Sequence, residues 1–97
     1  MSTPNPSEPA SPRQTTAAKR AQTSSSREKI KQIEAAMAKL QAIIDDLDDK
    51  LSRPGLFERS PEKAAEMGKA RTVAAERLAL AEEAWLTASE ELESAEA

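Results

Sequence analysis

The chain is short and poor in aromatic residues, because its 97 amino acids include one Phe, one Trp and no Tyr. This length allows one small domain, and it leaves little material for a globular core around a large enclosed active site. The sequence is 32% charged and rich in Ala, Glu, Lys, Leu and Arg, which is the composition of a coiled coil. It has no Cys and no His, which excludes disulfides, thiolate metal sites and imidazole-based catalysis.

The formal net charge of −3 is unevenly distributed. Residues 1–26 carry three basic residues and one acidic residue, a net +2, which leaves −5 for residues 27–97. Since phosphate neutralisation dominates nucleic-acid affinity, an acidic body confines any such contact to a local basic patch. The sequence has no apolar stretch typical of a secretion signal and no run of about 18 apolar residues, so we expect a cytoplasmic protein without membrane contact.

Residues 1–25 form an arm that we expect to be disordered. Up to residue 26 the chain has ten Ser or Thr residues, four prolines and no Leu, Ile, Val or aromatic residue. Such a segment buries too little apolar surface to offset its ordering entropy. The arm is either a flexible linker or a tether open to modification.

The first predicted helix spans residues 26–52. Ser25 and Glu28 have the spacing of a capping box, which marks the start of a helix. Large apolar residues then recur in steps of three and four, the heptad pattern of a coiled-coil seam. These seam residues are Ile30, Ile33, Met37, Leu40, Ile44, Leu47 and Leu51.

A turn is predicted at residues 53–60. Pro54 disfavours the helical conformation at the residue before it, and Gly55 supplies the positive φ that a reversal needs. Ser60 followed by Pro61 indicates an N-cap with proline at the first helical position. A second helix should therefore begin where the turn ends.

The second predicted helix spans residues 61–95 and has a seam rich in alanine. We expect Leu56 and Phe57 of the turn to cover the closed end of this seam, over Leu51 and Ala64. Small seam residues allow the two helix backbones to approach closely. The seam residues are Ala64, Met67, Arg71, Ala74, Leu78, Ala81, Trp85, Ala88, Leu92 and Ala95.

The charge pattern favours an antiparallel hairpin over a parallel dimer. The acidic end of the first helix would lie beside basic residues of the second, and its basic start would lie opposite the acidic end of the second. A parallel dimer would instead place like charges side by side. Facing residue numbers should sum to about 115, so that Ile44 faces Arg71 and Ile30 faces Trp85. The predicted fold class is all-α: a two-helix antiparallel coiled-coil hairpin with a disordered N-terminal arm.

No catalytic or nucleotide-binding motif is present. The segment Gly68-Lys69-Ala70 lacks both the upstream glycine and the Ser or Thr of a phosphate-binding loop. A two-helix seam also offers no pocket in which the pKa of a carboxylate could be tuned. We therefore expect no enzymatic activity, no catalytic residue, no cofactor and no small-molecule substrate.

The acidic run Asp45–Asp49 suggests a divalent-cation site, since hard cations favour carboxylate oxygens. The run lacks the glycine-centred turn and the terminal Glu of a calcium loop. The favoured interpretation is a solvated face with Asp46–Lys50 and Asp49–Arg53 pairs, and no metal.

Two seam residues allow alternative interpretations. Trp85 is either a stacking platform for a nucleobase or the largest core residue, packed against Ile30; its seam position favours the core. Arg71 either reaches Asp48 and sets the helix register or marks a surface left open for a partner; we favour the register.

One basic cluster stands out as a candidate phosphate-binding site, running from the arm into the first helical turns. The alternative interpretation is a solubilising face, because Glu28 interrupts the cluster and no aromatic residue accompanies it. The candidate nucleic-acid-binding residues are Lys19, Arg20, Arg27, Lys29 and Lys31.

The turn and the second predicted helix contain a set of spaced motifs: Leu51-Ser52-Arg53-Pro54-Gly55-Leu56-Phe57, Pro61, Trp85-Leu86 and Glu90-Glu91-Leu92. With these motifs, residues 27–97 resemble the C-terminal coiled-coil domain of Uup-type ABC-F ATPases. It implies an antiparallel coiled-coil hairpin appended to tandem ATPase cassettes, in proteins tied to ribosome function and, for Uup-type members, to DNA binding through this domain. Two departures limit it: these 97 residues contain no ATPase cassette, and the hairpin is acidic, which disfavours duplex DNA except at the basic cluster.

The resulting functional hypothesis is a non-catalytic module that binds DNA or ribosomal RNA. The alternative is a protein-interaction or spacer coiled coil without nucleic-acid binding, which could dock on ABC-F ATPase cassettes or on another helix. Three apolar residues that lie off the seam, Val73, Leu80 and Leu86, are its evidence.

Overall fold

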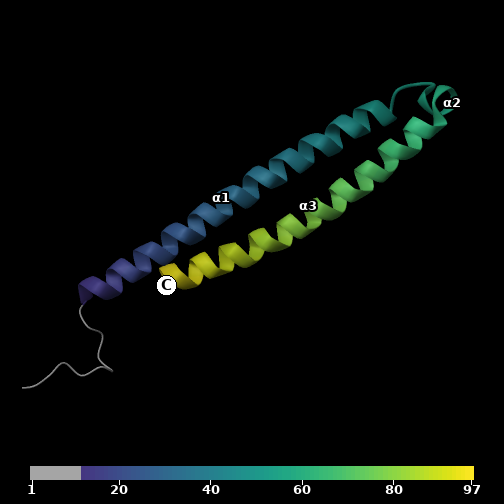
Figure 1. Cartoon of the computed structure of the whole chain (residues 1–97). Helices are drawn as coiled ribbons and strands as arrows, with labels where there is room; N and C mark the ends of the chain where they lie inside the picture. The colour runs from purple at the N-terminus through teal and green to yellow at the C-terminus, as the bar shows by residue number, and fades with distance from the viewer. Residues whose placement is uncertain (1–11) are drawn as a thin grey trace, which may run out of the picture.

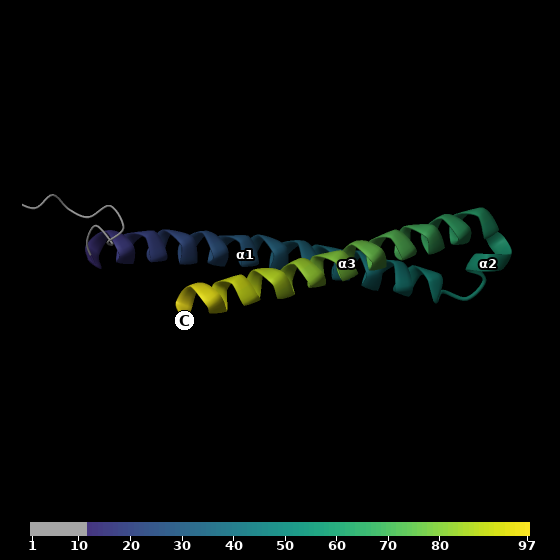
Figure 2. The same ribbon diagram turned by 90° about the horizontal axis from the view of Figure 1, so that it is seen from below.

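The computed structural model describes residues 12–97, and side chains from residue 17 onward. It contains a long helix α1 (Pro12–Leu51), a one-turn helix α2 (Leu56–Arg59) and a second long helix α3 (Pro61–Glu96). The two long helices lie side by side and run in opposite directions, joined at one end through α2 (Figure 1, Figure 2). Residues 12–97 contain no strand, and the predicted all-α hairpin is confirmed.

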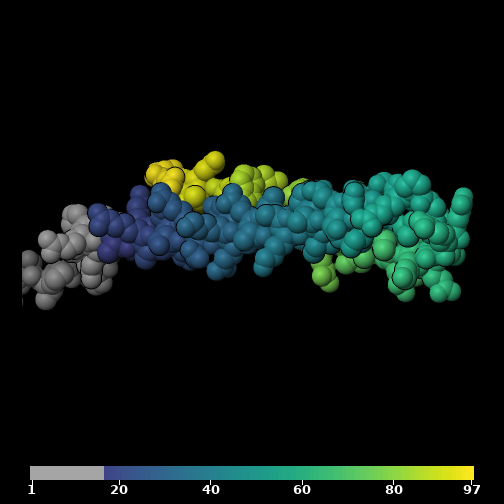
Figure 3. Space-filling model, turned by 90° about the horizontal axis from the view of Figure 1, so that it is seen from above, coloured from purple at the N-terminus to yellow at the C-terminus, as the bar shows by residue number. Residues whose placement is uncertain are grey.

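The core is a single thin seam between α1 and α3. Every residue of the two predicted seams is buried or half-buried, and the pattern on α1 continues back to Ser26 and Thr23. The fully buried residues are one isoleucine and three alanines, Ile44, Ala64, Ala74 and Ala88, which are 0–6% exposed. Large side chains of α1 therefore pack against the close-lying backbone of α3. The resulting molecule is a slender rod, as the space-filling view shows (Figure 3).

The first helix begins at Pro12, earlier than the predicted start at residue 26. Residues 12–25 are thus helical, which corrects the prediction of disorder for this part of the arm; residues 1–11 lie outside the described residues. The physical reason is that propagation of an existing helix costs far less than its nucleation. The strong helix formers Ala17, Ala18 and Lys19 continue the helix through the predicted cap at Ser25.

The hinge reverses the chain at the predicted residues. Gly55 has a φ of +80°, the left-handed conformation that favours glycine. Ser60 occupies the N-cap position of α3 and Pro61 its first turn, although the Ser60 side chain makes no capping hydrogen bond. The Arg59 side chain instead stabilises the turn, since it donates to the backbone oxygens of Gly55 at 3.4 Å and Pro54 at 3.3 Å.

The prediction that Phe57 covers the closed end of the core is wrong, because its side chain is 63% exposed. Leu56, in contrast, is half-buried. Both residues lie in the one-turn helix α2, where successive side chains point about 100° apart. A single turn can therefore direct one of the two toward the seam, and it directs Leu56.

Polar contacts between the long helices agree with the expected register. Arg71 donates through its Nε and Nη2 to the Asp48 carboxylate, as predicted. Trp85 Nε1 donates to Glu34 at 3.3 Å. In both pairs the residue numbers sum to 119, one helical turn beyond the predicted facing layers. This offset is expected, because helical side chains slant toward the N-terminus and so carry those of α3 toward the hinge.

Replacing Ile44 with Asp should unfold the hairpin, because a carboxylate would be placed in the most buried large-residue position of a seam with little stability to spare. We expect a loss of about 3 kcal/mol or more and, therefore, of most helical circular dichroism at 25 °C. The neighbouring exposed Ala42→Asp is the matched control and should retain its melting transition. Equal melting curves for both variants would contradict the seam.

The Asp48–Arg71 pair should make stability depend on pH. The hydrogen bonds and charge of Arg71 lower the pKa of Asp48 below its ordinary value of 3.8, so the pair stabilises the fold above that pH and ceases to do so as pH falls through the lower folded-state pKa. The wild type should melt higher than Asp48→Asn at pH 7, and the difference should vanish in acid. A difference in melting temperature that is independent of pH would refute this role.

Candidate nucleic-acid interface

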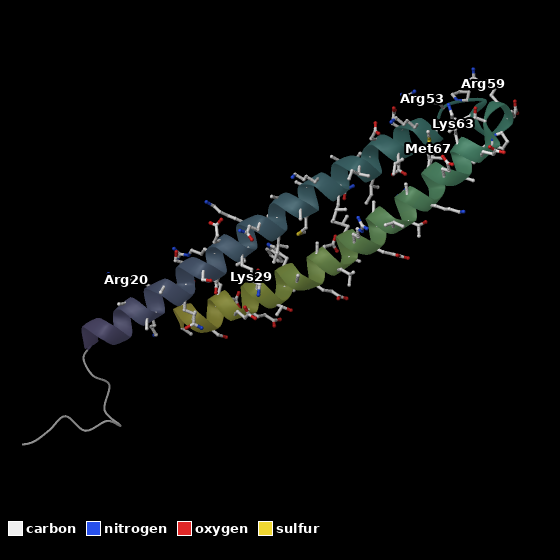
Figure 4. The ribbon with its side chains drawn as sticks, viewed as in Figure 1. Arg20, Lys29, Arg53, Arg59, Lys63 and Met67 are labelled. Carbon is white, nitrogen blue, oxygen red and sulfur yellow. The ribbon has the colours of Figure 1, made fainter. Side chains whose placement is uncertain are left out.

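The five candidate basic residues all lie on the exposed surface of α1, near the open end of the hairpin. Arg20 and Lys29 are labelled there in Figure 4. Helix α1 extends past the end of α3 at this end, so its first turns have no partner helix (Figure 1). The site is therefore a protruding helical surface flanked by the C-terminal turn of α3.

Two ion pairs show that these cations lie on opposite flanks of the seam. Arg27 Nη2 lies 2.9 Å from Glu96 Oε1, and Lys29 Nζ lies 3.8 Å from Glu91 Oε2. Arg27 and Lys29 are two residues apart, which corresponds to a rotation of about 200° around the helix. They therefore lie on either side of the apolar stripe that contains Ile30 and Ile33. We call the two sides the Arg27 flank and the Lys29 flank.

Four of the five candidates gather at one shallow hollow on the Arg27 flank. Steps of four, three and four residues place Arg20, Ser24, Arg27 and Lys31 on one face of α1, which explains why they converge. Lys29 lies outside the hollow. Two carboxylates, Glu28 and Glu96, line the same hollow, which leaves it an excess of two positive charges. The lining residues are Lys19, Arg20, Thr23, Ser24, Arg27, Glu28, Lys31, Ala95 and Glu96. Lys19 also lines an adjoining hollow with Glu90 and Glu91.

The ion pairs at this end leave their cations accessible. The Arg27 and Glu96 side chains are 66% and 45% exposed, and those of Lys29 and Glu91 are 58% and 53% exposed. Exposed pairs of this kind contribute about 0–1 kcal/mol each. A phosphate oxygen could therefore replace Glu96 as the partner of Arg27 at low cost in free energy, and it would form a stronger, bidentate contact.

Sequence reasoning placed Lys19 and Arg20 on a disordered arm and so missed that they share a helical face with Arg27. The signal that could have located the helix start is Ser11-Pro12-Arg13-Gln14, which has the form of a capping box with proline at the first helical position. Such short polar patterns are common, and the predicted helix start rested on the one at Ser25, which an apolar stripe follows.

A second gathering of cations lies at the hinge, which the sequence-based search for basic clusters also missed. Arg53, Arg59 and Lys63 all lie at the hinge end of the hairpin (Figure 4), near the exposed Phe57 in the chain. Two of these cations are already engaged: Arg53 pairs with Asp49 at 3.2 Å, and Arg59 holds the turn carbonyls. With the acidic run of α1 nearby, the hinge offers no excess of positive charge.

The remaining sequence candidates have structural partners. Trp85 is half-buried in the seam and bonded to Glu34, which supports a core residue rather than a stacking platform. In the acidic run, Asp46 pairs with Lys50 at 2.9 Å, as predicted. Among the described residues no cluster of three or more acidic side chains could hold a metal ion.

Between residues 12 and 97, no helix combines the length and the apolar character that a membrane span requires.

Comparison with known proteins identifies the hairpin itself. Residues 21–94 match the family model described as ABC transporter C-terminal domain, so the match covers the hinge and most of both long helices. Comparisons with curated proteins and with solved structures gave no significant match. Because the family model covers most of the 97 residues, the chain belongs to the ABC transporter C-terminal domain family.

Proposed function

We propose that this chain is a non-catalytic module of the Uup type that binds the phosphate backbone of DNA or ribosomal RNA through the hollow at its open end. One observation supports the proposal: four cations of the N-terminal part of α1 line a single hollow with two carboxylates. Lys29, on the other flank, is outside the binding set and acts at most through long-range attraction.

The spacing of these cations suits a nucleic-acid strand. Arg20 and Lys31 are eleven residues apart, or about 16 Å along the helix, a length over which a strand presents several phosphates. Side chains that contact phosphates position a nucleic acid without reading its sequence. The hollow contains no aromatic residue for stacking. We therefore expect binding that depends strongly on salt and weakly on sequence.

The acidic body of the hairpin restricts this contact to one end. Residues 27–97 carry a net charge of −5, so a duplex lying along the rod would be repelled. An end-on contact through about four cations predicts a slope of roughly −3 to −4 when log K is plotted against log salt. Affinity should therefore be modest and easily abolished by salt.

Neutralising the hollow should weaken binding. We expect Arg20→Gln combined with Lys31→Gln to reduce affinity for duplex DNA or a ribosomal RNA hairpin at least tenfold at low salt, measured by fluorescence anisotropy. The matched control Lys29→Gln combined with Lys39→Gln removes the same charge elsewhere on α1 and should cost much less. No binding by the wild type at low salt would refute the proposed function, and equal losses would refute the site.

Releasing Arg27 should strengthen binding. In Glu96→Gln the hollow loses the carboxylate that competes with phosphate for Arg27, so we expect a rise in affinity of about three- to tenfold at low salt. Glu66→Gln, near the hinge, makes the same change in net charge far from the hollow. If both variants raise affinity equally, the effect comes from net charge and Arg27 makes no direct contact.

The second candidate function is a protein-interaction or spacer element, for example one that docks on ABC-F ATPase cassettes. The observation in its favour is that Val73, Leu80 and Leu86 are 44%, 65% and 55% exposed. Absence of nucleic-acid binding in the titrations above would favour this candidate.

A further inference from the structure

An apolar surface lies on the Lys29 flank, away from the basic hollow. Lys29 of α1 pairs with Glu91 of α3. Ile43 and Arg77 lie two heptads closer to the hinge on α1 and α3, so they also lie across the seam from each other. Val73 and Leu80 lie one turn on either side of Arg77, on the same face of α3. Ile43, Val73 and Leu80 are 48%, 44% and 65% exposed, and we call them the apolar flank.

The two flanks differ in how the helices are joined across them. Three cross-helix polar contacts lie on the Arg27 flank, whose α1 residues Arg27, Glu34 and Asp48 repeat at multiples of seven. On the Lys29 flank, the described residues show no cross-helix hydrogen bond or ion pair between Lys29 and the hinge. Exposed large apolar side chains occupy this part of the flank, where the other flank has cross-helix polar contacts. Such exposed apolar side chains are expected for a surface that a partner covers.

Charges along α3 identify a partner that fits this surface. On the hinge side of Val73 the exposed charged residues include Lys63 and Lys69, and beyond Leu80 they include Glu83 and Glu90. None of these four has an ion-pair partner within the described part of the hairpin. Glu62 and Glu66 accompany the two lysines, so this face of α3 is neutral in sum toward the hinge and negative toward the open end. A second copy in the reversed direction would bring the unpaired Lys63 and Lys69 beside the unpaired Glu90 and Glu83.

We propose that a second copy of this chain covers the apolar flank, with its α3 antiparallel to the first and a two-fold axis between Glu76 and Arg77. In this arrangement, the numbers of two residues that face each other from the two copies sum to 153. Val73 of each copy then meets Leu80 of the other, and Glu76 meets Arg77. The interface is isologous, so each favourable contact occurs twice.

Charged residues of α3 farther from the two-fold axis also pair between the two copies. Lys63 of each copy meets Glu90 of the other, and Lys69 lies beside Glu83. Glu66 faces the neutral Thr87. Among these flanking positions one like-charge contact arises, between Glu62 and Glu91, and there Lys29 already balances Glu91. A parallel arrangement would instead place Lys against Lys and Glu against Glu, which costs free energy.

The dimer leaves the proposed nucleic-acid interface free. Glu82 and Ser89 share the heptad position of Glu96, which pairs with Arg27. Leu86 lies one turn from both of them, so it belongs to the Arg27 flank and lies outside the dimer surface. The basic hollow is on that flank too. The inference does not rest on nucleic-acid binding, and an antiparallel dimer would carry one hollow at each end. With few large residues in the interface, we expect a micromolar dissociation constant.

Sedimentation equilibrium over a range of concentrations tests the proposal. The wild type should dimerise, and Leu80→Glu should raise the dissociation constant at least tenfold because it places a carboxylate against Val73 of the second copy. The matched control Leu86→Glu introduces the same change at a similarly exposed site on the other flank, and it should leave the dissociation constant unchanged within twofold. Helical circular dichroism of each variant shows that the hairpin remains folded.

A charge exchange tests the antiparallel orientation. Lys69→Glu alone should weaken the dimer several-fold, and adding Glu83→Lys should restore it, because the two residues meet only across the two-fold axis. A wild-type chain that stays monomeric at concentrations of about 1 mM overturns the proposal and leaves the flank for a different protein. The proposal is also overturned if Leu86→Glu dissociates the dimer and Leu80→Glu does not. Failure of Glu83→Lys to restore the dimer of Lys69→Glu overturns it as well.

Discussion

The close packing of large α1 side chains against alanines of α3 is the contact on which the rest of the structure depends. Ala64, Ala74 and Ala88 are 2%, 5% and 0% exposed, so the α1 side chains rest almost on the α3 backbone. Ile44 is the large residue that this packing buries most completely. Two helices in contact bury one stripe each, which leaves the remaining surface of both to solvent or to partners.

Because the seam is thin, its register depends on polar contacts beside it. The apolar stripe alone would tolerate displacement by one heptad, since alanine recurs every seven residues in α3 from Ala74 to Ala95. Arg71 breaks this repetition, and its bond to Asp48 singles out one register. A polar residue at a seam position that specifies register at some cost in stability is a known device of coiled coils.

The helical periodicity of the sequence was sufficient to predict the seam and the Arg71–Asp48 contact, and Pro54-Gly55 was sufficient to predict the hinge. Seam prediction succeeds because burial in a two-helix rod is decided by heptad position alone, and the hinge prediction succeeds because few residues other than Gly55 adopt its positive φ. The predicted start of α1 was wrong because the helix continues through the capping pattern at Ser25, since propagation of an existing helix costs little. The exposure of Phe57 was missed because its orientation depends on α2, a single turn without a periodic signal.

The basic cluster is divided between the two flanks of the hairpin, and this division could not be predicted from the order of the residues in the sequence. Lys29 and Arg27 are near neighbours in sequence, yet they pair with different turns of α3 on opposite sides of the seam. Lys19 and Arg20 precede the family match at residues 21–94, whereas Arg27 and Lys31 lie within it. The hollow thus combines residues of the family hairpin with a helical extension that precedes the matched region. Because the extension supplies Lys19 and Arg20, the excess of positive charge in the hollow depends on residues outside the family match.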